Sequence, residues 1–304
     1  MDSIMGNFST WISAMRLRTL PLSVSGIILA SFLAKHDQVF NWSICIIAIL
    51  TTLGLQILSN FANDYGDGVK GTDNDDRIGP QRAIQSGKIT PKQLLNGIII
   101  TVIITLFLAI LLIFVAFGLE YFLLSSMFLI LGIAAVVAAI KYTVGSSAFG
   151  YKGLGDVFVF IFFGLVSVIG CYVLYAKTVN FITVLPAITI GLLSTGVLNL
   201  NNMRDRISDE KSNKITLAVK LGAKKAKKYH YVLIISAIVL SFLFGVLYYD
   251  SPFNFIYVVA YIPLFIHLKT VRNNVDLKLL DPELKKLALT TVLLALLMGI
   301  GQLL

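Results

Sequence analysis

Residues 96–117 read NGIIITVIITLFLAILLIFVAF, a run of 22 residues without a charged side chain. A helix needs about 20 consecutive apolar residues to cross the hydrocarbon core of a bilayer. Comparable stretches recur at about 20–34, 43–60, 121–140, 154–175, 181–199, 231–249, 253–268 and 286–304. Because alternating strands would not supply such runs, the sequence predicts an all-α, multi-pass membrane bundle of nine transmembrane helices.

The composition of the whole chain agrees with lipid as its main solvent. Of the 304 residues, 57% are hydrophobic and 13% are charged, whereas a soluble domain carries about a quarter charged residues. The two cysteines, Cys45 and Cys171, lie in apolar runs, which excludes a disulfide scaffold. The net charge of +9 comes from residues between apolar segments, so it indicates membrane orientation and no nucleic-acid partner. Residues 1–304 therefore form one integral membrane domain.

The basic residues also predict the orientation of the chain. Every Lys and Arg except Lys35 and Lys177 falls on one side of the nine-span arrangement. Since positive charges stay on the cytoplasmic side, we expect the amino terminus inside and the carboxyl terminus outside the cell membrane.

Two spans end in matching acidic stripes. After the second span, Asn60, Asp64 and Asp67 share one helix face if the helix continues. After the sixth span, Asn201, Asp205 and Asp209 do the same. The stripes lie 141 residues apart, which predicts two similar four-helix units, at about 16–140 and 154–268, with the ninth helix at 286–304 appended.

The residue types in these stripes favour a magnesium and phosphate site. Facing carboxylates repel one another, so a cation should lie between them. Hard oxygen ligands without His or Cys favour Mg²⁺, which completes its shell with substrate phosphates. Arg77, Arg82, Lys88 and Lys214 follow the stripes and either grip phosphate oxygens or only mark a wet cytoplasmic loop. In the alternative hypothesis, the aspartates are loop residues and helix caps that pair with nearby lysines.

The run Asn63-Asp64-Tyr65-Gly66-Asp67 matches an NDxxD signature, and Asp205 to Asp209 matches DxxxD. In these motifs the chain resembles the UbiA superfamily of intramembrane prenyltransferases. Within it the chain is most similar to the MenA branch, the 1,4-dihydroxy-2-naphthoate polyprenyltransferases of menaquinone (vitamin K2) synthesis. Four runs carry this closer resemblance, namely Gly71-Thr72-Asp73, Arg82 to Gly87, Tyr151 to Asp156 and Asn201 to Asp205.

The resemblance implies Mg²⁺-dependent transfer of a polyprenyl group from an allylic polyprenyl diphosphate to 1,4-dihydroxy-2-naphthoate. The naphthoate would lose its carboxyl group and give demethylmenaquinone on the cytoplasmic side of the membrane. The implied catalytic residues are Asp64, Asp67, Asp205, Asp209 and Lys214, with the four aspartates as metal ligands. The implied substrate-binding residues are Asn60, Asn63, Arg82, Gln85, Ser86, Lys141, Tyr142, Asp156, Asn201 and Arg204.

Alternatives remain for single residues and for the function. Lys141 could snorkel and Asp156 could cap the fifth span. Tyr65 and Tyr142 could face a carbocation or anchor the membrane interface. Another aromatic acceptor such as 4-hydroxybenzoate is an alternative substrate. A secondary transporter is less favoured, because its coupling residues are expected near mid-span.

Overall fold

The computed structural model describes residues 2–73 and 78–304, and it contains no strand within those ranges. Nine helical segments in this part of the chain are long and apolar enough to cross a membrane, which confirms the predicted multi-pass bundle. The elements are α1 (Asp2–Met15), η1 (Leu17–Thr19), α2 (Leu20–His36), α3 (Trp42–Val69), α4 (Pro91–Phe117), α5 (Phe122–Lys141), η2 (Phe149–Lys152), α6 (Gly155–Val159), η3 (Phe160–Gly170), α7 (Cys171–Ala176), η4 (Phe181–Thr183), α8 (Val184–Arg204), α9 (Arg206–Lys211), α10 (Leu217–Leu247), η5 (Pro252–Ala260), α11 (Tyr261–Asn273), η6 (Leu277–Leu280) and α12 (Asp281–Gly301).

Local sequence signals start and bend several of these helices. Asn41 caps α3 by accepting hydrogen bonds from the N–H groups of Ser43 and Ile44. Thr90 and Gln93 form a reciprocal capping box at the start of α4. The helix α10 is kinked at Gly222, whose φ of 70° is readily adopted by glycine.

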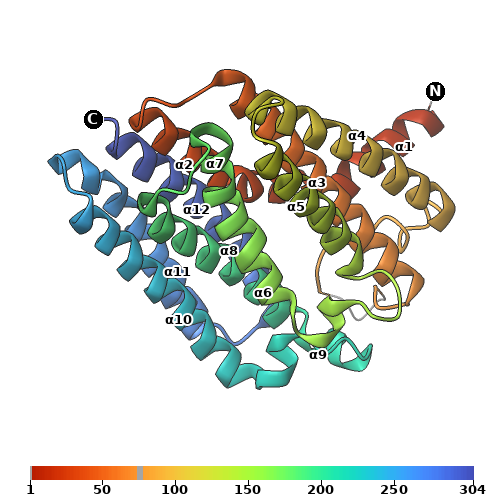
Figure 1. Ribbon diagram of the computed structural model, residues 1–304. Coiled ribbons are helices and arrows are strands. Elements are labelled where there is room, and N and C mark those ends of the chain that lie inside the picture. Colours follow the sequence, from red (N-terminus) through yellow and green to blue (C-terminus); the bar gives the residue numbers. More distant parts are fainter. Residues whose placement is uncertain (1, 74–77) are drawn as a thin grey trace.

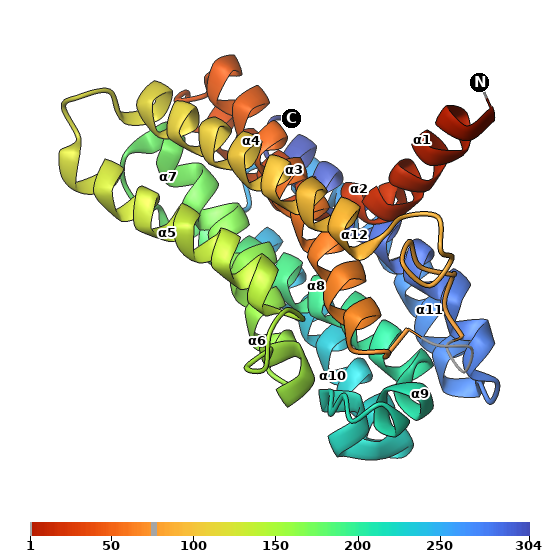
Figure 2. The same ribbon diagram turned by 90° about the vertical axis from the view of Figure 1, so that its right-hand side faces the viewer.

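The helices surround a central layer (Figures 1 and 2). In Figure 1, α3, α4 and α5 lie on one side, α10 and α11 lie on the other, and α8 and α12 lie between them. The last span, α12, packs against α2, α8 and η5, so it closes the bundle against the first span. The division into two four-helix units stays a prediction, and so does the orientation of the termini.

Packing separates a buried core from a lipid-facing surface. The larger apolar cluster joins α2, α7, α8, α10, α11 and α12, and a smaller one lies between α1, α3 and α4. By contrast, α4 exposes long apolar side chains such as Phe107, at 64% of its full surface. The helix α1, which projects at one corner in Figure 2, was not predicted. It is held by Trp11, whose ring meets Phe61 edge-on at 5.4 Å between centroids.

Candidate active site

The first acidic stripe lies on the last turns of α3. Because that helix continues to Val69, Asn60, Asp64 and Asp67 lie on one helix, as their spacing predicted. All three side chains are buried. Asn60 donates through Nδ2 to the carbonyl oxygen of Met15 at 2.9 Å, which ties the stripe to the end of α1.

Two arginines from separate segments meet at Asp64. Arg16 forms an ion pair with Oδ1, and Nε of Arg82 lies 3.7 Å from the same oxygen. The N–H of Ala83 donates to Oδ2 at 3.5 Å. Arg16 adopts a left-handed backbone conformation, with φ 50° and ψ 58°, which is uncommon for a residue other than glycine. Spacing along the chain could not predict this contact, since Arg16 and Asp64 lie 48 positions apart.

The second stripe differs from its prediction. The helix α8 ends at Arg204 and α9 begins at Arg206, so the helix is interrupted at Asp205. The interruption is local, because the Asp205 N–H donates to the Asn201 carbonyl at 3.0 Å and the Asp209 N–H donates to the Asp205 carbonyl at 2.8 Å. The three side chains therefore stay one turn apart, and both aspartates are buried.

The two stripes meet at Lys214. Its Nζ lies 3.0 Å from Asp67 Oδ2 and 3.8 Å from Asp209 Oδ1. The hydroxyl of Tyr151 donates to Asp67 Oδ1 at 2.7 Å, and the Tyr151 ring centroid lies 5.5 Å from the ammonium. Burial alone would lower the pKa of Lys214, but the two carboxylates outweigh burial and raise this pKa above its ordinary value. The chain itself thus supplies a cation between the acidic rows.

Arg204 lies behind the second stripe. Its guanidinium is fully buried and donates to both Asp205 oxygens, at 2.8 and 2.6 Å, and to Asn201 Oδ1 at 2.9 Å. It also pairs with Asp281, the first residue of α12. Because the guanidinium is covered, it supports Asp205 from behind, and the expected contact of Arg204 with a substrate stays a prediction.

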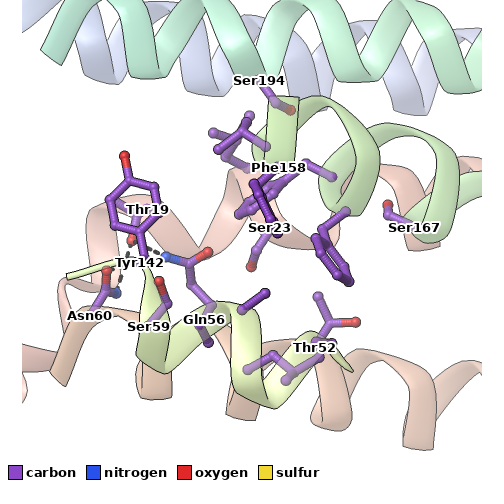
Figure 3. Close-up of a pocket in the computed structure, with 18 of the residues that line it drawn as sticks. Thr19, Ser23, Thr52, Gln56, Ser59, Asn60, Tyr142, Phe158, Ser167 and Ser194 are labelled. Atoms are coloured by element: carbon purple, nitrogen blue, oxygen red, sulfur yellow. Dashed lines mark hydrogen bonds between the residues drawn. The ribbon is translucent and has the colours of Figure 1, made fainter. Parts of the chain in front are cut away.

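A cavity of about 400 Å³ opens next to these groups. Figure 3 shows Tyr142, Gln56, Asn60 and Phe158 around this space. The rings of Phe149 and Phe158 stack at 3.8 Å between centroids, and Tyr142 meets Phe149 edge-on at 5.4 Å. The charged and amide side chains in the lining are Arg16, Arg18, Gln56, Asn60, Asn63, Asp67, Arg82, Asn201, Asn202, Asp205, Lys214 and Lys285. The cavity therefore joins a charged region to an uncharged one.

Only some of the predicted substrate-binding residues line the cavity. Those that line the cavity are Asn60, Asn63, Arg82, Tyr142 and Asn201. Ser86 lines a neighbouring polar cavity together with Asp64 and Arg82. Gln85 accepts a hydrogen bond from the Arg82 N–H at 3.2 Å, so its side chain shapes the loop that presents that arginine.

Other predicted residues lie away from the cavity. Lys141 is exposed at the end of α5, and Asp156 is buried beside Tyr229. Tyr65 packs against the smaller apolar cluster. Arg77 lies outside the described residues.

The donor chemistry of the stripes fits Mg²⁺. Carboxylate and amide oxygens are its preferred protein ligands, and the buried aspartates and neighbouring asparagines provide them. Within residues 2–73 and 78–304, no three Asp, Glu, His or Cys side chains are grouped as the ligands of one metal ion. The arrangement therefore fits ions that share a few carboxylates with phosphate oxygens, and it does not fit an all-protein cage.

Known proteins resemble this chain over most of its length. The sequence model of the UbiA prenyltransferase family matches residues 24–278. The 1,4-dihydroxy-2-naphthoate octaprenyltransferase of Haemophilus influenzae is 41% identical, over 96% of this chain and 95% of its own. The enzyme of the same name from Escherichia coli is 39% identical, over 96% of this chain and 94% of its own.

Solved structures share the fold. A UbiA homolog from Archaeoglobus fulgidus, bound to DMAPP and Mg²⁺, superposes with a TM-score of 0.64 at 13% identity, covering 96% of this chain and 99% of its own. A UbiA homolog from Aeropyrum pernix gives a TM-score of 0.64 at 15% identity, covering 95% of this chain and 96% of its own. The predicted family is thereby confirmed, and the chain belongs to the UbiA prenyltransferase family.

Proposed function

We propose that this membrane protein transfers a polyprenyl group from an allylic polyprenyl diphosphate to 1,4-dihydroxy-2-naphthoate, a step of menaquinone synthesis. Relatives at 41% and 39% identity carry the name of this activity and match along almost their whole length. The observation that carries the proposal is structural: Asp67 and Asp209 converge on Lys214 at the charged region of a cavity that continues between apolar and aromatic walls.

The charged region suits the diphosphate of the donor substrate. Lys214 and Arg82 line the cavity and present cationic donors to phosphate oxygens. Asp64, Asp67, Asp205 and Asp209 are the carboxylates that would hold Mg²⁺. When bound, Mg²⁺ would supply positive charge to the diphosphate as it departs.

The basic residues stabilise the diphosphate as it leaves the donor substrate. As the carbon–oxygen bond of the donor cleaves, its electron pair leaves with the diphosphate, and negative charge grows on the departing oxygen. Fixed cations at that position stabilise the charge as it develops, without the reorganisation that water would need. The ammonium of Lys214 is already held in place by two carboxylates.

The uncharged region suits the prenyl chain and the aromatic acceptor. Leu22, Ile27, Leu112, Phe128 and Leu174 line it and offer apolar contact to a prenyl tail. Phe158 and Tyr142 place aromatic rings in the same lining, and such faces stabilise an allylic cation. Apolar walls also keep water from consuming that cation.

The acceptor completes the reaction without an oxidant. The naphthoate ring supplies the electron pair of the new carbon–carbon bond to the allylic carbon. The ring gives up its carboxylate as CO₂, so that overall the prenyl group takes the place of the carboxyl group. The products are diphosphate, CO₂ and demethylmenaquinol, the reduced form of demethylmenaquinone.

The charge pattern supports a site that faces the cytoplasm from the cell membrane. The acidic motifs and their cations, Arg82 and Lys214, share one end of the bundle with most of the basic residues. Because basic segments stay cytoplasmic, this end faces inward.

An acceptor panel tests the proposal. Membranes containing the protein are incubated with labelled polyprenyl diphosphate and either 1,4-dihydroxy-2-naphthoate or 4-hydroxybenzoate, with and without Mg²⁺. We expect a prenylated naphthoate product and diphosphate release only with the naphthoate and Mg²⁺. A product from 4-hydroxybenzoate alone would overturn the acceptor assignment. Substrate uptake into vesicles without any diphosphate release would indicate a transporter.

A further inference from the structure

Asp281 connects the second acidic motif to the start of the first span. As the first residue of α12, it accepts a hydrogen bond from Nη1 of Arg204. Its other oxygen lies 3.6 Å from Nη1 of Arg18, a cavity-lining residue of η1. Asp281 thus pairs with Arg204 behind the site and with Arg18 in the cavity wall.

The shared arginine makes Asp281 and Asp205 electrostatically coupled. Arg204 carries one positive charge, and its buried guanidinium is clamped between the two carboxylates, one on each side. These three groups carry one net negative charge, and Arg18, 3.6 Å from Asp281, brings the set of four to neutrality. Without Asp281, the remaining Arg18, Arg204 and Asp205 would carry one net positive charge and would attract a divalent cation less strongly.

We propose that Asp281 is a positioning residue for the metal ligand Asp205, acting through Arg204. It holds the guanidinium behind the carboxylate and takes up part of its charge, so that Asp205 stays available to a divalent ion. This inference rests on the proposed Mg²⁺-dependent function. Outer partners of metal ligands affect metal affinity or activity by about 10- to 100-fold.

A competing explanation is purely structural, because an acidic residue at a helix start also interacts favourably with the helix dipole. The two explanations predict different results for Asp281→Asn. A structural role would lower thermal stability and change the KM of both substrates. The positioning role raises the Mg²⁺ requirement and leaves the KM for the naphthoate unchanged.

The test measures metal binding directly as well as turnover. Mn²⁺ is titrated into the detergent-solubilised protein with inorganic pyrophosphate present, and free Mn²⁺ is followed by electron paramagnetic resonance. For Asp281→Asn we expect about tenfold weaker Mn²⁺ binding and about tenfold more Mg²⁺ for half-maximal turnover. The control is Asp276→Asn, which makes the same change at an exposed position five residues earlier and is expected to match the wild type.

A charge-preserving variant keeps the test decisive if Asp281→Asn does not accumulate. Asp281→Glu retains the carboxylate and is expected to bind Mn²⁺ within about threefold of the wild type, and a tenfold loss there would refute the charge argument. Wild-type affinity in Asp281→Asn, in an otherwise active protein, would overturn this inference alone. An inactive wild-type protein with Mg²⁺ and the naphthoate would instead overturn the proposed function.

Discussion

Replacing Lys214 by methionine removes the cation at the meeting point of the two motifs while keeping a side chain of similar length. The ammonium lies 3.0 Å from Asp67 and 3.8 Å from Asp209. With an effective dielectric constant of about 20, each attraction is about 4–6 kcal/mol before desolvation is subtracted. Measured losses on breaking a buried pair are about 3–5 kcal/mol, because a buried charge is left uncompensated.

Two results are expected from Lys214→Met. The variant should be less stable without ligands, since the carboxylates then face each other without the ammonium. Mg²⁺ with pyrophosphate should stabilise the variant more than it stabilises the wild type, because a divalent ion can replace the missing charge. Turnover should still fall by about 10²- to 10³-fold, the usual effect of removing one fixed donor from developing negative charge.

The assays are thermal unfolding in detergent with and without Mg²⁺ and pyrophosphate, and the prenyl-transfer rate at saturating substrates. Lys224→Met is the matched control, because Lys224 is exposed on α10. Turnover within threefold of the wild type would refute the placement of Lys214 at the departing diphosphate. Equal stabilisation of variant and wild type by Mg²⁺ would refute its role between the carboxylates.

Three further predictions follow from the same contacts. Asp67→Asn should abolish turnover without preventing membrane accumulation, whereas Asp250→Asn, at a side chain that is 71% exposed, should leave turnover unchanged in the same assay. Tyr151→Phe removes the donor 2.7 Å from Asp67 and should lower kcat about 10- to 100-fold, because hydrogen bonds to charged groups contribute about 1.5–3 kcal/mol. Since the pKa of Lys214 is raised, its charge should persist as pH rises through the ordinary lysine value of about 10.4 and be lost only above it. A kcat profile with an alkaline limb at pH 9 that vanishes in Lys214→Met would indicate a lowered pKa for Lys214 and would contradict this prediction.

Hydropathy and spacing predicted the spans and the first motif because both depend on local sequence. Each apolar run is long enough to define a helix without reference to its neighbours. Asn60, Asp64 and Asp67 share a face because α3 contains no proline and continues through Gly66 and Gly68 to Val69. The contacts Arg16 to Asp64 and Arg204 to Asp281 join residues 48 and 77 positions apart. No periodicity within one segment indicates which distant segment will pack against it.

The second motif shows a different limit of local reasoning. Its spacing is compatible with one continuous helix, yet the structure interrupts that helix at Asp205. Asp205 is the residue whose two oxygens are both engaged by the guanidinium of Arg204. Arg204, at the end of α8, is fully buried and also pairs with Asp281 of α12, 77 positions away. The spacing within α8 did not indicate this second partner.

The ion pairs of the site predict how metal and donor substrate bind together. Among the residues that the structure describes, five carboxylates, at Asp64, Asp67, Asp205, Asp209 and Asp281, pair directly with five basic side chains, at Arg16, Arg18, Arg82, Arg204 and Lys214. These pairs are neutral overall, so a diphosphate that enters alone brings uncompensated negative charge, and a divalent ion that enters alone brings uncompensated positive charge. Each ligand should therefore raise the affinity of the other, by an equal factor for both, as linkage requires. Mn²⁺ titrations with and without pyrophosphate measure that factor, after correction for Mn²⁺–pyrophosphate binding in solution. Equal Mn²⁺ affinity in the two titrations would show that charge balance does not govern this site.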